Sequence, residues 1–232
     1  MLKLIFYLVV PLLFLSNKAY LPDSKRAGDI RTAVWPRLKK ELGDKGLKFN
    51  YPIYMRIFKE EKQLEIWIKS GKRYQLFKCY NICFYSGGLG TKTRAGDRKS
   101  PEGFYTIKPN QLNPESRYHL AINIGYPNKL ETANGYTGNN IMIHGICSSD
   151  GCYAMTDQRI EEIYTLVYKA FESGQKEIML DIFPFRMDEL HLKTYGKYSC
   201  LPFWKTIKPA YDLFQKNHIP PVVKIKGREY VF

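Results

Sequence analysis

Residues 144–154, HGICSSDGCYA, constrain the fold more than any other stretch of this chain. An apolar run over residues 141–143 ends at His144, which predicts a short strand. The turn-forming residues 148–151, SSDG, follow and lead the chain back to Cys152, eight positions after the histidine. This arrangement can bring an imidazole and a thiol within hydrogen-bond reach of each other.

The pairing of His144 with Cys152 predicts nucleophilic catalysis. An isolated thiol has a pKa of about 8.5, so it needs a base to form the reactive thiolate at neutral pH. No Asp or Asn stands at a motif-like spacing to orient the imidazole, so we expect a backbone carbonyl of the His144–Gly145 segment to do so. The amides of Gly151 and Cys152 are the candidate oxyanion donors, and Ser149 is expected to shape the turn.

Each of these residues also has an ordinary structural interpretation. A cysteine beside glycine and tyrosine is most often a small buried hydrophobic residue, and a single histidine most often a structural hydrogen-bonding group. The joint pattern favours catalysis, because His-Gly lies upstream and Ser-x-Gly-Cys downstream.

The chain resembles the L,D-transpeptidase (YkuD-like) catalytic domain family, whose signature is His-Gly followed by Ser-x-Gly-Cys. Within that family it is most similar to the YafK-like branch, which carries the compact block HGxCxSxGCxAMTD. Cys147 and residues 154–157, AMTD, match the remaining positions of the block. Similar segments elsewhere cover residues 56–61, 96–105, 123–128 and 183–187.

The resemblance implies a mainly β fold, a sandwich or barrel-like catalytic domain with flanking helices. It also implies attack by Cys152 on an L–D bond of a peptidoglycan stem peptide, with a thioester intermediate and no cofactor. Transfer to an amine would give a cross-link, an exchanged residue or an attached lipoprotein. Transfer to water would give a carboxypeptidase or an amidase that releases a murein-linked lipoprotein. The branch is associated with the hydrolytic reactions, which favours hydrolysis slightly.

The chain departs from the commoner family pattern at two points. Asp150 replaces the histidine of Ser-His-Gly-Cys, and residues 153–155, YAM, replace an arginine that follows the cysteine. We expect Asp150 to point to solvent, as turn aspartates usually do. Because a guanidinium reads carboxylates well, other arginines become candidates for substrate binding. The candidate carboxylate readers are Arg94, Arg98 and Arg186, and the candidate groove residues are Tyr126, Tyr136 and Tyr153.

The N-terminus has the pattern of an export signal. Lys3 precedes an apolar run over residues 4–15, which is short for a membrane-spanning helix of about 20 residues. We expect residues 1–19 to be a signal peptide or an N-terminal anchor, and the protein to be periplasmic or otherwise extracytoplasmic. Cleavage after Ala19, membrane association through an uncleaved anchor, and a buried N-terminal helix all stay open.

Charge and cysteine content agree with an extracytoplasmic location. The net charge is +14, from 36 Lys and Arg against 22 Asp and Glu, which suits an anionic wall polymer or lipid surface, or serves solubility alone. No nucleic-acid-binding motif occurs, so we expect no nucleic acid partner. The five cysteines leave a disulfide pairing open, except that Cys79 and Cys83 lie too far apart along one strand. No metal is expected, since no CxxC or histidine-rich spacing occurs.

Periodicity places the remaining elements. Alternating apolar residues predict a hairpin over residues 64–78, and further strands over 104–107, 119–124, 141–144 and 177–182. Helices are expected over residues 160–171, over 204–217 with a start or kink at Pro209, and over 29–42 with an interruption at Pro36. The expected divisions are a basic, partly helical segment over 20–50, a catalytic domain over 51–187, and a helical and strand extension over 188–232 packed on the same domain.

Two other functional classes stay open on the sequence alone. A non-catalytic cell-wall-binding module would retain the fold with an unreactive Cys152, and a general cysteine protease would cleave bonds between L-residues. The sequence leaves the oligomeric state open.

Overall fold

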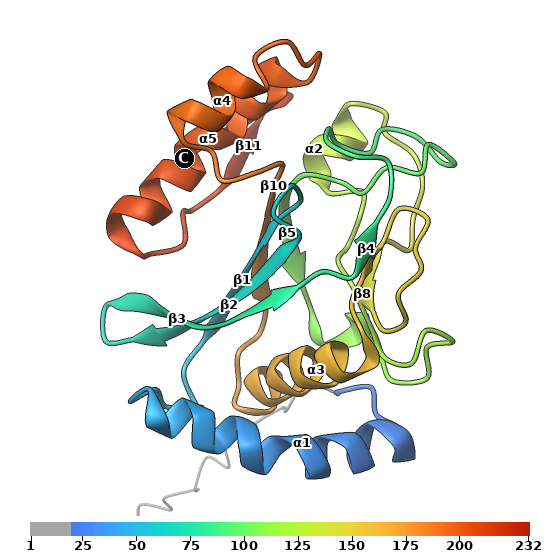
Figure 1. Cartoon of the computed structure of the whole chain (residues 1–232), viewed down its shortest axis with the longest axis vertical. Coiled ribbons are helices and arrows are strands. Elements are labelled where there is room, and N and C mark those ends of the chain that lie inside the picture. The colour runs from blue at the N-terminus through green and yellow to red at the C-terminus, as the bar shows by residue number, and fades with distance from the viewer. Residues whose placement is uncertain (1–19) are drawn as a thin grey trace, which may run out of the picture.

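The computed structural model describes residues 20–232, so the predicted signal or anchor segment over residues 1–19 lies outside the described residues. Two five-stranded sheets form its centre (Figure 1). The first sheet has the order β3 (Arg73–Asn81), β2 (Gln63–Ser70), β1 (Ile53–Phe58), β10 (Ile178–Phe183), β5 (Gly103–Ile107). The second has the order β4 (Phe84–Tyr85), β9 (Tyr153–Ala154), β8 (Met142–His144), β7 (Ala121–Asn123), β6 (Leu112–Asn113). This β-rich architecture with flanking helices confirms the expected fold class.

Each sheet contains one parallel pair of neighbouring strands. In the first sheet β1 runs parallel to β10, and in the second β8 runs parallel to β9, while all other neighbours are antiparallel. The predicted hairpin is β2–β3, and its alternating residues Leu64, Ile66 and Ile68 are buried. Because these residues share one face of a pleated strand, they enter the same core.

The helices α1 (Lys25–Asp44) and α3 (Asp157–Glu172) lie side by side and cover the lower end of the molecule in Figure 1. The helix α3 contains the whole of the expected range 160–171 and begins three residues earlier, at Asp157. The expected interruption of α1 at Pro36 is wrong, because the helix passes through this residue. Burial of Val34, Leu38 and Leu42 at helical spacing stabilises α1 despite the N–H that proline lacks.

The C-terminal segment packs against the first sheet at the upper end of the molecule in Figure 1. It contains α4 (Glu189–Thr194), α5 (Leu201–Asn217), β11 (Lys224–Lys226) and β12 (Glu229–Val231). α5 starts before the expected position, at Leu201, and continues through Pro209. Trp204 of α5 and Tyr230 of β12 join Phe104 and Phe183 of the first sheet in a second apolar cluster. The central strands β1 and β10 are therefore buried on both faces of the sheet.

Shorter elements complete the fold. The helix α2 (Lys129–Ala133) and the 3-10 turn η1 (Pro109–Gln111) lie in the connections next to the second sheet. Within residues 20–232, no helix is both long enough and apolar enough to cross a membrane.

Candidate active site

The parallel pair β8–β9 brings His144 and Cys152 to neighbouring positions. The register pairs Ile143 with Tyr153 and His144 with Ala154. Cys152 therefore lies beside Met142, and it is two positions before Ala154, the residue that pairs with His144. Paired residues of parallel strands point to the same face, and every second residue shares that face. His144 and Cys152 therefore lie on one face, and Met142 N donates a hydrogen bond to Cys152 Sγ at 3.3 Å.

A backbone carbonyl orients the imidazole, as expected. His144 Nδ1 lies 2.6 Å from Gly145 O, which can only accept, so Nδ1 carries the proton and Nε2 is free to accept one. The side chain is 2% exposed, and the half-exposed ring of Tyr118 lies over it at 4.6 Å between ring centroids. Burial lowers the pKa of His144, although the bond to Gly145 opposes the shift.

The surroundings of Cys152 also favour its neutral form. Its Sγ donates a weak hydrogen bond to Asn140 O at 3.6 Å and forms no direct bond to His144 in the part of the chain that the structure describes. Burial raises the pKa of Cys152, and the charge of Asp150 raises it further, while the Met142 amide and Lys92 lower it. The two shifts therefore both favour the uncharged form, thiol for Cys152 and neutral imidazole for His144.

Serine hydroxyls hold the turn that carries Cys152. Ser149 Oγ and Ser100 Oγ both donate to Cys152 O, at 2.8 and 3.3 Å. Gly151, with φ +100°, donates its N–H to Ser86 Oγ at 2.7 Å. The Gly151 N–H is therefore already hydrogen-bonded and is not available as the expected oxyanion donor. The Cys152 amide is left as the candidate oxyanion donor. Ser86 and Ser100 lie about fifty or more residues before Cys152 in the sequence, so no local motif indicated them.

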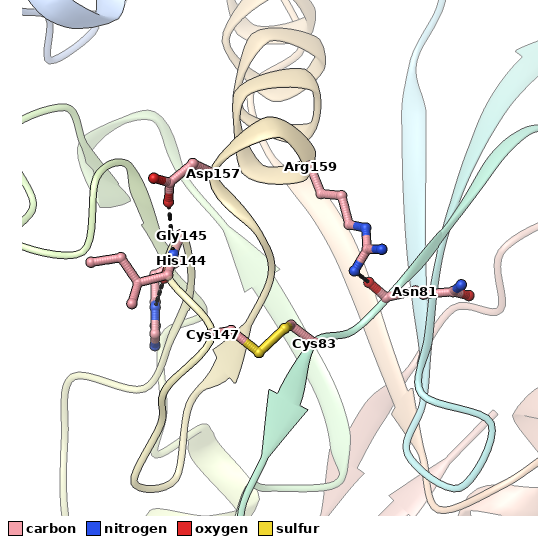
Figure 2. Close-up of a disulfide and its surroundings, with 8 residues drawn as sticks. Asn81, Cys83, His144, Gly145, Cys147, Asp157 and Arg159 are labelled. Atoms are coloured by element: carbon pink, nitrogen blue, oxygen red, sulfur yellow. Dashed lines mark hydrogen bonds between the residues drawn. A yellow bond between two sulfur atoms is a disulfide. The ribbon is translucent and has the colours of Figure 1, made fainter.

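A disulfide joins Cys83, just before β4, to Cys147 in the loop after His144 (Figure 2). The sequence had left this pairing open. Cys79, Cys152 and Cys200 are free thiols. Within residues 20–232, no group of three His, Cys, Asp or Glu side chains is arranged to hold a metal ion.

The three candidate arginines have different surroundings. Arg186 donates to Gln63 Oε1 at 2.6 Å and to Glu65 Oε1 at 2.8 Å on β2, so its guanidinium is engaged by the first sheet. We therefore remove Arg186 from the candidate substrate-binding residues. Arg98 lies 3.7 Å from Asp150, and the two side chains are 78% and 69% exposed, so Asp150 points to solvent as expected. Arg94 is exposed and its amide donates to Asp97.

Two of the three candidate tyrosines belong to the core. Tyr153 is fully buried and its hydroxyl donates to Pro101 O at 2.6 Å, which excludes a place in a groove. Tyr126 is 5% exposed, and its hydroxyl donates to the carbonyls of Lys92 and Thr137, so it too is structural. Tyr136 lines a cavity of about 230 Å³ between α2, α5 and β12.

A family profile and similar known proteins identify the same family for this chain. The sequence profile of YkuD, the L,D-transpeptidase catalytic domain, matches residues 52–177. The chain is 49% identical over 180 residues to "Putative L,D-transpeptidase YafK" of Escherichia coli strain K12, which covers 78% of this chain and 73% of that protein. The same values hold for the protein of that name from E. coli O157:H7.

Two solved structures have a limited similarity to this chain. The helical cell shape determining protein Pgp2 of Campylobacter jejuni is 24% identical with a TM-score of 0.46, over 64% of this chain and 55% of that chain. Bdellovibrio bacteriovorus Bd1075 is 20% identical with a TM-score of 0.40, over 70% of this chain and 59% of that chain. The chain thus spans little more than half of each. From the sequence profile and the YafK relatives, the protein belongs to the YkuD L,D-transpeptidase catalytic domain family, and its role is related to peptidoglycan.

Proposed function

We propose that the protein is a cysteine acyl-transfer enzyme that acts on L–D bonds of peptidoglycan stem peptides, with Cys152 as nucleophile and His144 as general base. One observation carries this proposal. The Gly145 carbonyl holds His144 Nδ1, which leaves Nε2 as a proton acceptor on the strand face that also bears Cys152. A neutral base beside a neutral thiol suits proton transfer during attack rather than a preformed ion pair.

In the first half-reaction, Cys152 Sγ attacks the carbonyl carbon on the L side of the bond while Nε2 of His144 takes the thiol proton. The Cys152 amide donates to the oxyanion of the tetrahedral intermediate. When the intermediate collapses, the carbon–nitrogen bond breaks and the imidazolium gives its proton to the leaving amine. The acyl group then remains on sulfur as a thioester.

In the second half-reaction, water or an amine attacks the thioester carbonyl and His144 accepts its proton. The carbon–sulfur bond breaks, and the proton returns to the sulfur. The similarity to the YafK-like branch favours water as the acceptor, so the products would be a shortened stem peptide or a released lipoprotein. Transfer to an amine is the alternative outcome.

The proposed setting is outside the cytoplasm. A structural disulfide persists in oxidising compartments, which agrees with the export signal expected over residues 1–19. We propose that residues 51–187 carry the catalytic chemistry and that residues 188–232 support them through the second apolar cluster.

A time course with defined muropeptides tests this function. The protein and its Cys152→Ala variant would be incubated with tetrapeptide, tripeptide and lipoprotein-linked forms, and the products followed by mass spectrometry. We expect a shortened or released peptide with the parent protein and a loss of at least about a thousandfold in rate with Cys152→Ala. Dimers or exchanged residues would instead show transfer.

The matched control is Cys79→Ala, because Cys79 is a free thiol on β3 of the first sheet. This variant should turn over like the parent. Equal activity of the parent and Cys152→Ala would refute a cysteine mechanism. The absence of any product from every muropeptide would favour the non-catalytic wall-binding module.

A further inference from the structure

The loop that follows His144 is held by the carboxylate of Asp157, the first residue of α3. Asp157 Oδ1 accepts a hydrogen bond from Ile146 N at 2.8 Å, and Figure 2 shows the side chain directed at the His144–Gly145 segment. Thr156, the residue that caps α3, makes no side-chain capping bond. An aspartate in a first helical turn is usually explained by the helix dipole, but here its oxygen is used by the loop.

The peptide group between Gly145 and Ile146 connects Asp157 to the histidine. Its carbonyl oxygen lies 2.6 Å from His144 Nδ1, and its N–H donates to Asp157. A trans peptide is planar, and its C=O and N–H point in opposite directions. A bond that fixes the direction of the N–H therefore also fixes the carbonyl that selects the tautomer of His144.

The backbone at Gly145 and Ile146 has a conformation that needs stabilising contacts from other segments. Ile146 has a φ of +61°, a left-handed conformation that β-branched residues rarely adopt. Gly145 is tightly enclosed, since an added Cβ would lie 2.6 Å from Asp157 Oδ1 and 2.8 Å from Tyr118 O. Asp157 thus contacts both residues of the peptide that orients the imidazole.

We propose that Asp157 is a positioning residue for His144, which it holds in the Nδ1-protonated tautomer through the Gly145–Ile146 peptide. This inference rests on the proposed function for its catalytic consequence, but its structural part concerns the imidazole alone. Without the bond to Asp157 the peptide can rotate, the carbonyl leaves Nδ1, and the imidazole can protonate at Nε2 instead. In that tautomer Nε2, the proposed proton acceptor for the thiol, already carries a proton and can no longer act as the base.

The test compares Asp157→Ala with Asp157→Asn, which keeps the accepting oxygen and removes the charge. The first measurement is the nitrogen NMR spectrum of the His144 ring, which distinguishes the two tautomers. The second is the rate at which iodoacetamide alkylates Cys152 at pH 7, in proteins that lack Cys79 and Cys200. We expect a mixture of tautomers and an alkylation rate about ten- to a hundredfold lower in Asp157→Ala, and parent behaviour in Asp157→Asn.

The matched control is Arg159→Ala, two residues further along the same helix. Arg159 donates to Asn81 O at 2.9 Å and makes no contact with the histidine loop, as Figure 2 shows. This variant should keep the parent tautomer and the parent alkylation rate. If Asp157→Ala does not fold, the substitution would be made in an Ile146→Gly background. Glycine at position 146 removes the backbone strain, so proteins with and without the Asp157 carboxylate can still be compared.

Two results would overturn the inference. A folded Asp157→Ala variant with the parent tautomer would show that the peptide is held without the carboxylate. An Asp157→Asn variant as impaired as Asp157→Ala would show that the charge matters rather than the accepted bond. Failure of the muropeptide experiment would leave the tautomer measurement unaffected, so the two proposals are tested separately.

Discussion

At the scale of the residue, the protonation of His144 depends on how completely its imidazole is shielded from water. The ring of Tyr118 lies over the imidazole, and burial is the main cause of the lowered pKa. We predict that Tyr118→Ala raises the pKa of His144 toward its ordinary value of about 6.5, because water would then solvate the charged form. The acidic limb of Cys152 alkylation would move to higher pH by the same amount.

The ring titration of His144 by NMR checks this prediction, with Tyr118→Phe as the control. Phenylalanine keeps the ring over the imidazole and leaves the backbone bond from Gly145 N to Tyr118 O in place. It should therefore titrate like the parent. An unchanged titration in Tyr118→Ala would mean that the other neighbours of His144 already exclude water.

At the scale of the element, the disulfide ties the histidine loop to the strand β4. The two cysteines are 64 positions apart in the sequence, and for a loop of this size the chain-entropy model gives a stabilisation of about 4 kcal/mol. We predict that replacing both Cys83 and Cys147 by serine lowers the urea midpoint, and that it reduces alkylation of Cys152 because the loop beside His144 gains freedom. Urea unfolding at pH 7 and the alkylation rate are the measurements.

A matched control is the pair of replacements Cys79→Ser and Cys200→Ser, which removes two cysteines and no cross-link. This control should keep the parent's free energy of unfolding to within about 1 kcal/mol, and therefore nearly the parent midpoint. Equal midpoints for the two double variants would show that the cross-link adds nothing to the folded protein beyond the contacts around it.

The same scale shows why part of the structure was predictable from the sequence. In the β2–β3 hairpin apolar residues recur at every second position, and in α3 they recur every three to four positions. These spacings follow directly from the geometry of a strand and of a helix, so both elements could be predicted. The Gly145 carbonyl was also predictable, since it is adjacent to His144 along the chain. The YkuD-like fold was predicted from the resemblance of several whole segments to the family, and not from the spacing of apolar residues in any one element.

The remaining features depend on contacts between distant segments. Tyr153 follows Cys152 in the sequence, but β9 turns its ring into the core, and only the register with β8 reveals this. The bond from Gly151 to Ser86 and the bond from Ile146 to Asp157 likewise require the folded chain. Pro36 predicts an interruption of the helix because the local cost of proline is visible in the sequence, whereas the packing of α1 against α3 is not.

At the scale of the whole molecule, the stability of the fold should vary with pH through the buried carboxyl of Asp181 on β10. Burial raises its pKa to about 7, although the bond from Tyr54 and the charge of Arg56 oppose the shift. Between about pH 4 and pH 7 the folded protein therefore holds a proton that the unfolded chain has lost. The free energy of unfolding falls as pH rises through this interval, by an amount on the order of a few kcal/mol, and the fall ends above about pH 7.

We predict that Asp181→Asn removes this fall, because asparagine carries no charge at any pH and can still accept the Tyr54 hydrogen bond. Relative to the parent, the variant should gain stability as pH rises from 5 to 8, measured by urea unfolding. Burial also shifts the pKa values of His144 and Glu131, but both residues are present in the two proteins, so their contributions cancel. Asp97 provides the contrast: burial opposes the shift, but hydrogen bonds from Lys92 and three backbone amides lower its pKa to about 2. Its contribution is complete above about pH 4 and is lost only as pH falls toward 2, so Asp97→Asn should be less stable than the parent by a constant amount between pH 5 and 8. A constant difference for Asp181→Asn over the same range would mean that Asp181 is already ionised in the folded protein and that Arg56 compensates its burial.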